Sequence, residues 1–318
     1  METYPKTLAE FESQFSTEED CCKYLFLLRW PNGFQCPRCK GQKGWPVRVK
    51  LLQCGTCGYQ ASVTSGTIFQ GSRIPLTLWF RAIWWIAIQK NGASALSLKR
   101  ILGLGSYETA WSWLHKLRRA MIRQNRDRLS GTIEVDETYI GGLEEGLRGR
   151  QVENKTLVVI AAQKDGRKIG RIRMKQIADA SSASLHTFVN ESIEIGSTVV
   201  TDAWSGYSGL EPLGYMHKVI NLSKSKGRDQ SPSDLLPRVH RVASLLKRWL
   251  MGTHQGAVSH DHLDYYLDEF TFRFNRRTST HRGLLFYRLL EQAVNTPPTP
   301  YKKIIKHVQG LKQGKHNP

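Results

Sequence analysis

The stretch that decides the fold is Thr132-Ile-Glu-Val-Asp-Glu-Thr-Tyr-Ile140, which is followed by Gly141-Gly142. Apolar and polar residues alternate along it, and this period of two is typical of a strand, which the two glycines end. Asp136 lies in the middle of the strand. Because an unpaired carboxylate in an apolar strand is costly, we expect Asp136 to act as a ligand rather than as a surface residue.

The residues after this strand predict a mixed sheet. Residues 155–162 and 169–177 alternate on the two sides of the turn Lys164-Asp-Gly-Arg167, so they predict a hairpin and complete a meander of three strands. A helix and two more strands are expected over residues 181–193, 197–202 and 218–221. With the helix expected after residue 233, and with the strand at residues 218–221 as an addition, this is the β-β-β-α-β-α order of the RNase H-like layout, in which the first and fourth strands are neighbours.

Neighbouring first and fourth strands would bring Asp136 and Asp202 to one edge of the sheet. Two facing carboxylates repel each other unless a cation lies between them. A pair of divalent metal ions meets this need in phosphodiester chemistry, where it activates the attacking oxygen and stabilises the leaving one. Asp202 also precedes Trp204-Ser-Gly-Tyr207, so it can instead cap the following turn.

A helix that Ser233 or Asp234 can cap, with Pro237 in its early turns, would supply the third part of this site. His240 and Lys247 are seven residues apart, which is nearly two turns at ~3.6 residues per turn, so both leave one face about 10 Å apart. A histidine can ligate the metal ions and a lysine can bind a phosphate. The alternative is a partly buried surface histidine and a solvated lysine.

Four of the six cysteines form a second motif. Cys36-Pro-Arg-Cys39 and Cys54-Gly-Thr-Cys57 are separated by residues 40–53. Each C-x2-C pair places two thiolates on a tight turn, and four sulfurs close the shell of a structural zinc ion with no open position for catalysis. Residues 45–53 alternate like one short strand that enters the second turn, as in a zinc ribbon.

The net charge of +19 comes from 46 basic and 27 acidic residues, and its distribution is uneven. Residues 61–130 hold eleven basic and two acidic residues, whereas residues 1–30 hold three basic and six acidic ones. A basic field attracts phosphates by releasing their counterions, so the expected partner is nucleic acid. A solvated basic surface is the alternative.

The helical residues 63–130 carry much of this charge. A buried helix is expected over residues 76–88, and two more over residues 94–102 and 106–121 with a glycine turn between them. This is a helix-turn-helix layout. Residues 111–119 mix aromatic and basic side chains, which favours contact with a major groove over plain packing.

Composition bounds the remaining classes. At 318 residues the chain is expected to hold two or three domains, and 40% hydrophobic residues exclude disorder for most of it. No stretch approaches the ~18–20 apolar residues of a membrane span, and the acidic residues 1–20 do not resemble a signal peptide. The expectation is a cytoplasmic, nucleoid-associated protein without a membrane partner.

Four stretches together resemble one family: Val135-Asp-Glu-Thr-Tyr-Ile-Gly-Gly142, Thr201-Asp-Ala-Trp-Ser-Gly-Tyr207, Leu245-Leu-Lys-Arg-Trp-Leu-Met-Gly-Thr-His254 and Tyr266-Leu-Asp-Glu-Phe-Thr-Phe-Arg-Phe-Asn-Arg-Arg277. They are similar to the bacterial insertion-sequence transposases of the ISXO-like family, which join an N-terminal zinc ribbon to a DDE-type, RNase H-like catalytic domain. The resemblance covers about residues 10–290.

The resemblance implies Asp136 and Asp202 as the first two ligands of the catalytic metal ions. In this family the third ligand, Glu or Asn in many members, precedes a lysine by seven positions. Counting back from Lys247 gives His240. Imidazole is softer than a carboxylate and suits Mn²⁺ better than Mg²⁺, so the histidine leaves the choice between these ions open.

The function implied is that of a transposase. It would cut the ends of its element, the terminal inverted repeats, and then use the freed 3′-OH to attack target DNA. Joining two ends in one event implies a homodimer on DNA. The competing interpretation is a non-catalytic zinc-ribbon and helix-turn-helix DNA-binding protein with a decayed RNase H-like domain.

The fold class expected is therefore a multi-domain α+β chain with five parts. These are an N-terminal helical lead, the zinc ribbon, the helix-turn-helix-like segment, the catalytic domain and a basic flexible tail, at residues 1–30, 31–62, 63–130, 131–290 and 291–318. Cys21 and Cys22 are expected in a helical core. Arg273, Arg276 and Arg277 are expected to meet DNA phosphates.

Overall fold

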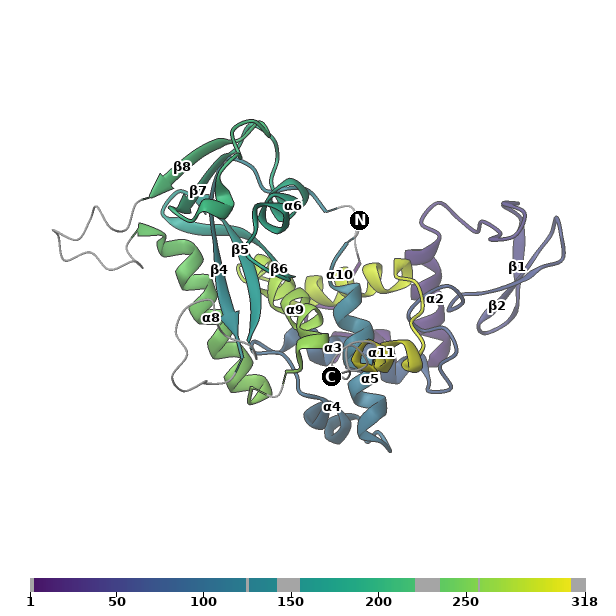
Figure 1. Cartoon of the computed structure of the whole chain (residues 1–318). Coiled ribbons are helices and arrows are strands. Elements are labelled where there is room, and N and C mark those ends of the chain that lie inside the picture. The colour runs from purple at the N-terminus through teal and green to yellow at the C-terminus, as the bar shows by residue number, and fades with distance from the viewer. Residues whose placement is uncertain (1–2, 124–125, 142–154, 221–234, 257, 310–318) are drawn as a thin grey trace, which may run out of the picture. The chain divides into compact units, whose positions relative to one another are not determined.

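The chain is described by a computed structural model over residues 3–123, 126–141, 155–220, 235–256 and 258–309 (Figure 1). The chain folds into two compact units. The first consists of Met1–Arg123 and Thr278–Pro318, and the second of Gln124–Arg277. Each unit has its own core, and the candidate active site lies in the second.

The second unit is built on a mixed sheet of five strands. These are β4 (Thr132–Ile140), β5 (Thr156–Asp165), β6 (Lys168–Ile177), β7 (Thr198–Asp202) and β8 (Met216–Ile220). Their order is β6-β5-β4-β7-β8, with β4, β5 and β6 antiparallel and β7 and β8 parallel to β4. The first and fourth strands of the unit are thus neighbours, and the predicted RNase H-like fold class is confirmed.

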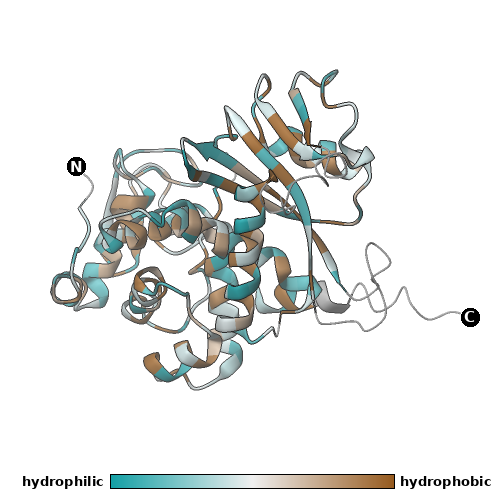
Figure 2. Cartoon of the chain, turned by 90° about the vertical axis from the view of Figure 1, so that its left-hand side faces the viewer, coloured by the Kyte–Doolittle hydropathy of each residue, from teal (hydrophilic) through white to brown (hydrophobic). Residues whose placement is uncertain are grey.

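Helices cover both faces of this sheet. On one face α6 (Ser182–Ser192) packs against the side chains of β4 and β5 that include Val135 and Val159. On the other face α8 (Pro237–His254) and α9 (Leu263–Asn275) pack against those that include Val158 and Ile160. Because both faces are covered, the inner strand β5 is buried on both sides from Thr156 to Ala162, and Figure 2 shows the apolar (brown) and polar (teal) residues along the strands and helices. The apolar stripe of α9 is buried, at Leu263, Tyr266, Leu267 and Phe270.

The first unit is mainly helical. Its helices are α1 (Leu8–Gln14), α2 (Glu18–Arg29), α3 (Leu76–Ile88), α4 (Ala95–Leu102), α5 (Tyr107–Ala120), α10 (Arg282–Asn295) and α11 (Tyr301–Gln309). The hydroxyl groups of Thr7, Thr17, Ser94 and Ser106 each accept the backbone N–H three residues ahead, which explains where four of these helices begin. Cys21 and Cys22 are buried on α2, as predicted.

The predicted helix-turn-helix layout is present as α4, a turn and α5. Gly103 ends α4 with a φ of 62°, a left-handed conformation that glycine adopts without strain. Residues 111–119 were predicted to face a DNA groove, but Trp113, His115 and Arg118 are buried. Trp113 stacks on Trp79 of α3 at 3.7 Å between ring centroids, and α4, α10 and α11 also pack on α5. Most side chains of residues 111–119 are therefore buried by packing within the first unit.

Two domain boundaries differ from those predicted. Helix α10 belongs to the first unit, not to a catalytic domain that ends at residue 290, because Phe286 packs against an aromatic cluster from α1 and α3. In place of a flexible tail from residue 291, the chain forms α11, in which Ile304 is buried. Residues 310–318 lie outside the described residues.

The cysteine-rich segment forms a sheet of its own. Where one strand was predicted over residues 45–53, two strands form an antiparallel pair, β1 (Gly44–Arg48) and β2 (Leu51–Cys54). A third short strand, β3 (Gln60–Ser62), pairs with β2. The alternation that suggested one strand is interrupted by the turn that joins β1 to β2. Among the helices that the structure describes, none has the length and apolar character needed to cross a membrane.

Candidate active site and metal centre

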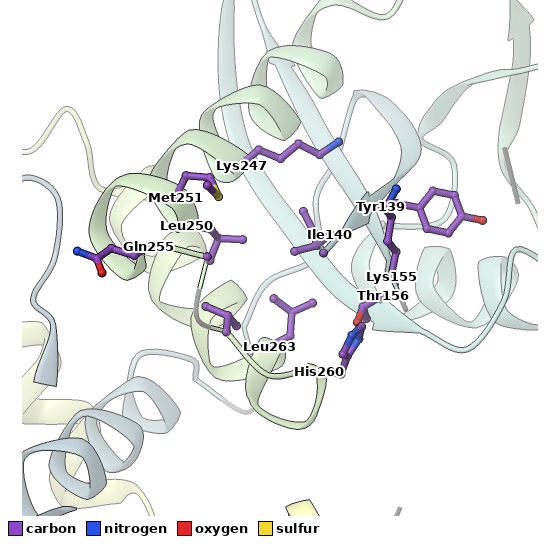
Figure 3. Close-up of a pocket in the computed structure, with 13 residues that line it drawn as sticks. Tyr139, Ile140, Lys155, Thr156, Lys247, Leu250, Met251, Gln255, His260 and Leu263 are labelled. Carbon is purple, nitrogen blue, oxygen red and sulfur yellow. The ribbon is translucent and has the colours of Figure 1, made fainter. Parts of the chain in front are cut away.

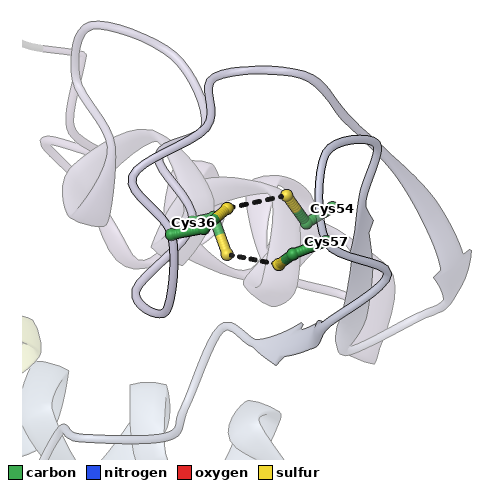
Figure 4. Close-up of side chains that lie close together, drawn as sticks. Cys36, Cys54 and Cys57 are labelled. Atoms are coloured by element: carbon green, nitrogen blue, oxygen red, sulfur yellow. Dashed lines mark hydrogen bonds between the residues drawn. The ribbon is translucent and has the colours of Figure 1, made fainter.

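The four cysteines of the ribbon converge on one point. Cys36 Sγ lies 3.8 Å from Cys57 Sγ, and Cys39 Sγ lies 3.6 Å from Cys54 Sγ (Figure 4). All four sulfurs lie within 4.8 Å of one another. Four sulfurs at ~2.3 Å from a zinc ion would be about 3.8 Å apart. Backbone N–H groups, first that of Cys57, lower the pKa of the Cys54 thiol and so favour a thiolate there.

In the described part of the chain, this is the only group of three or more histidine, cysteine or acidic side chains gathered closely enough to share one ion. The donor set and its spacing fit a closed, structural zinc site. Such a site is structural rather than catalytic, because four thiolates leave no coordination position open for water or substrate.

Asp136 lies on β4, where its Oδ1 accepts the backbone N–H of Glu137 at 2.9 Å. The parallel pairing of β4 with β7 runs up to the pair Glu134 and Val200. If this register were continued by two residues, Asp136 would come opposite Asp202, the last residue of β7. Both aspartates therefore lie on neighbouring strands, just beyond the point where the pairing of β4 with β7 ends.

Asp202 has a second contact that bears on its role. Its Oδ1 accepts the backbone N–H of Trp204 at 3.0 Å, and the indole Nε1 of Trp204 donates to Ala180 O at 2.8 Å. The carboxylate thus caps the turn after β7, the alternative that the sequence left open. Capping engages one oxygen and leaves the ligand role compatible with the geometry.

His240 is the side chain of α8 that reaches Asp136. Its Nδ1 lies 3.7 Å from Asp136 Oδ2, and the two side chains are 34% and 19% exposed. Burial lowers the pKa of the His240 imidazole, and the carboxylates of Glu134 and Asp202 oppose this shift. A lowered pKa favours the neutral imidazole, which is the form that ligates metals. Ser233 and Asp234, the predicted caps of this helix, lie outside the described residues.

Lys247 follows on α8 but does not reach the aspartates by any contact between described atoms. It lines a cavity beside the far end of β4, together with Lys155. Burial, and then the charge of Lys155, lower the pKa of the Lys247 ammonium group. The structure thus brings Asp136, Asp202 and His240 to one region, with Lys247 two turns along the same helix.

One residue of this region was missed by the sequence analysis. Glu134 is only 5% exposed and holds the start of α8: its Oε2 accepts the backbone N–H groups of Arg238 at 2.7 Å and Val239 at 3.0 Å. Its Oε1 accepts Arg238 Nη1 at 2.8 Å. No side chain at the N-cap of α8 makes a capping bond, so this carboxylate from β4 satisfies the helix start.

A signal for Glu134 exists in the sequence. Glu134 and Asp136 are two residues apart on one strand, so they face the same side, toward α8. The helix that carries His240 begins at Pro237 without a Ser, Thr, Asp or Asn directly before it. A helix start that lacks its own cap predicts an acceptor from elsewhere.

On the opposite face of β4, Glu137 is tied to the segment after β7. Tyr207 ends the short 3-10 helix η1 (Ser205–Tyr207), is fully buried and donates its hydroxyl to Glu137 Oε2 at 2.8 Å. Burial raises the pKa of Tyr207 well above its ordinary value, so the hydroxyl stays protonated and donating. This bond ties the turn that carries Asp202 to the strand that carries Asp136.

The three arginines predicted to meet DNA phosphates are used within the protein. Arg273 donates to Glu269, and its guanidinium is 12% exposed. The guanidinium of Arg276 lies 4.1 Å above the ring of Phe272. Arg277 donates to backbone oxygens of the β6 region and of α9. These arginines, in α9 and just after it, therefore make contacts within the helix and with the sheet.

These features define a chain with a four-cysteine ribbon and an RNase H-like domain that carries Asp136 and Asp202 on neighbouring strands. Residues 128–275 match the ISXO2-like transposase domain, and residues 16–60 match the transposase zinc-ribbon domain. A transposase zinc ribbon followed by an ISXO2-like transposase domain is the order inferred from the motifs, so these matches confirm the resemblance.

A curated relative and two solved structures are also similar. The relative is an uncharacterized protein in transposable element ISH50 of Halobacterium salinarum, 25% identical over 280 residues that cover 81% of this chain and 91% of the relative. The Mos1 strand transfer complex and a pre-cleavage Mos1 transpososome are 13% and 12% identical, each with a TM-score of 0.27. They cover 75% of this chain and 79% and 80% of their own. So low a TM-score supports no structural inference.

Proposed function

We propose that the chain is a metal-dependent transposase that cleaves the ends of an insertion sequence and transfers them to target DNA. The observation that supports this proposal is the approach of His240 to Asp136 at 3.7 Å, with Asp202 on the neighbouring strand β7, in a chain that matches a transposase domain. The chemistry is phosphodiester cleavage and strand transfer. Alternatives that need a nucleophilic side chain or an organic cofactor have no support in this site.

Asp136, Asp202 and His240 would hold two divalent metal ions, Mg²⁺ or Mn²⁺. Such ions activate the attacking oxygen and stabilise the leaving one. Ligands shared between two ions about 3.5–4 Å apart need not converge on one point, which suits a group spread over two strands and a helix. Neutral imidazole from His240 supplies a nitrogen ligand, and Lys247 would neutralise a neighbouring DNA phosphate.

Zinc would have a separate task in this proposal. Bound by Cys36, Cys39, Cys54 and Cys57, it would hold the ribbon in shape and thereby support recognition of the element ends. The partners proposed are the terminal inverted repeats and target DNA, contacted by a homodimer so that two ends can be joined in one event. The expected location is the cytoplasm, at the nucleoid.

The test is cleavage of the DNA ends that flank the gene, with Mg²⁺ and with Mn²⁺. The parent is expected to nick these ends, whereas Asp136→Asn and Asp202→Asn are expected to bind them without cutting. Asp165→Asn, at an exposed position at the end of β5, is the matched control and should cut like the parent. Binding by the parent without cleavage in either metal would favour the decayed, non-catalytic DNA-binding protein instead.

A further inference from the structure

A cavity of about 580 Å³ lies beside the far end of β4, close to the proposed catalytic residues (Figure 3). Its walls come from the end of β4, the residues that begin β5, the second half of α8 and the start of α9. This volume is within the ~300–1,000 Å³ typical of small-ligand sites. All of its walls belong to the second unit.

The polar side of the cavity is cationic. Lys247 of α8 and Lys155, the residue before β5, both line it. Figure 3 shows one side chain extending from the helix and the other from the start of the strand. None of the described residues that line the cavity is acidic. Two ammonium groups that face one space without a carboxylate repel each other, and an anion between them removes that cost. The polar side is therefore suited to a phosphate.

The floor of the cavity is apolar. Leu250 and Leu263 are almost fully buried beneath it, whereas Ile140 and Val258, which also line the cavity, are only partly buried. Met251 adds a thioether, and its residue is 65% exposed. A phosphate alone would leave this apolar surface uncovered, whereas the flat face of a nucleobase would cover it.

The cavity is placed along the strand that carries Asp136. Ile140 is four residues further along β4, which at ~3.3 Å per residue is about 13 Å. Each strand of B-DNA has one phosphate per ~3.4 Å of helix axis, so this distance corresponds to about four nucleotides. A DNA strand cut beside Asp136 would therefore pass the cavity within a few nucleotides of the cut.

We propose that this cavity binds one unpaired nucleotide of the cleaved DNA strand, with its phosphate between Lys155 and Lys247 and its base on the apolar floor. The cavity would thereby fix the register of the strand in the catalytic site. This inference rests on the proposed function and extends it by naming a nucleotide subsite and Lys155 as a binding residue.

The first test measures how binding of the end DNA depends on salt, without divalent metal so that nothing is cut. Loss of one phosphate contact should reduce the magnitude of the slope of log K against log [salt] by about 0.9. Between 50 and 200 mM salt, the affinity of such a variant should therefore fall by a factor about three times smaller than that of the parent. Lys155→Ala should show this change. Lys164→Ala, an exposed lysine near the other end of β5, is the matched control and should keep the parent slope.

The second test moves one abasic site stepwise through the nucleotides nearest the cut. One position should weaken binding by the parent by about fivefold, the lower end for loss of one base contact. In Met251→Ala the abasic site at that position should weaken binding less than in the parent, because less apolar surface remains for the base to contact. The proposal is overturned if Lys155→Ala keeps the parent slope, or if no position near the cut is sensitive in the parent.

Neither binding test requires cleavage, so the two proposals fail separately. A parent that cuts DNA while Lys155→Ala behaves like Lys164→Ala overturns the nucleotide subsite alone. A parent that never cuts, yet shows both binding effects, overturns the catalytic proposal and leaves the cavity as a nucleotide site of a DNA-binding protein.

Discussion

Removing the Glu134 carboxylate tests whether β4 holds the helix that carries His240. Glu134→Ala deprives two backbone N–H groups and the Arg238 guanidinium of their acceptor, and the side chains of Glu134 and Arg238 are only 7% and 18% exposed. Breaking a buried charge pair by removing one partner costs about 3–5 kcal/mol. Arg238 also donates to Gly166 O and Lys168 O, and these bonds remain. We therefore expect the lower end, about 3 kcal/mol of lost stability.

Two measurements on the full chain check this expectation. With a slope of about 2 kcal/mol per M, urea unfolding of the second unit should shift to lower urea by about 1.5 M. Cleavage should slow by roughly a hundredfold while end binding persists, because an error of 1 Å in a catalytic group can cost that much. Glu134→Gln keeps the volume and should give intermediate values.

The matched control is Glu191→Ala. Glu191 pairs with Lys175 at 2.6 Å, but the side chains are 56% and 45% exposed, so the loss should stay below about 1 kcal/mol. Parent-like unfolding and parent-like cleavage in Glu134→Ala would show that the start of α8 is held by other contacts. The reasoning about Glu134 would then be wrong, whatever the role of His240.

Other changes have equally definite outcomes. The double change Cys39→Ser and Cys57→Ser should abolish the zinc stoichiometry of one per chain measured by metal analysis, and retention of that zinc would contradict the closed four-cysteine site. His240→Ala should abolish cleavage without loss of end binding. His240→Glu should retain cleavage, with the metal preference shifted from Mn²⁺ toward Mg²⁺. Parent-like cleavage by His240→Ala would show that His240 is not a metal ligand. Lys247→Ala should slow cleavage less than His240→Ala does, as nicking rates will show. Tyr207→Phe should lower stability by about 1–1.5 kcal/mol in urea unfolding, through loss of one buried hydrogen bond, and an unchanged midpoint would contradict that role.

Much of the second unit could be predicted because its signals are local. The bounds of β4 follow from alternation that stops at a glycine pair, and α6 begins where Ser181 can cap it. The partner of α10 could not be predicted in this way. Its amphipathic pattern shows that one face is buried, but not that Phe286 packs against residues near the N-terminus.

The candidate site shows the same division. Strand order follows from the RNase H-like layout, and this brings Asp136 and Asp202 together; the seven-residue spacing places His240 and Lys247 on one helix. The contact between Glu134 and the start of α8 spans about a hundred residues of sequence, so the uncapped helix start indicates that an acceptor is needed but not which residue supplies it. The arginines of α9 looked available for DNA because sequence does not show which charges the fold itself uses.

The split of the first unit between the two ends of the chain has a consequence for protein synthesis. Residues 124–277 are inserted between α5 and α10, and Phe286 of α10 contacts Phe11, Phe80 and Trp84. A ribosome that adds ~5–20 residues per second needs roughly 10–30 s to travel from the end of α5 to the end of α10. During that interval the aromatic surface of the nascent N-terminal helices has no cover, whereas the inserted unit can already fold. The part of the protein that is made first is therefore completed last, and it is the part most exposed to aggregation and most dependent on chaperones during translation.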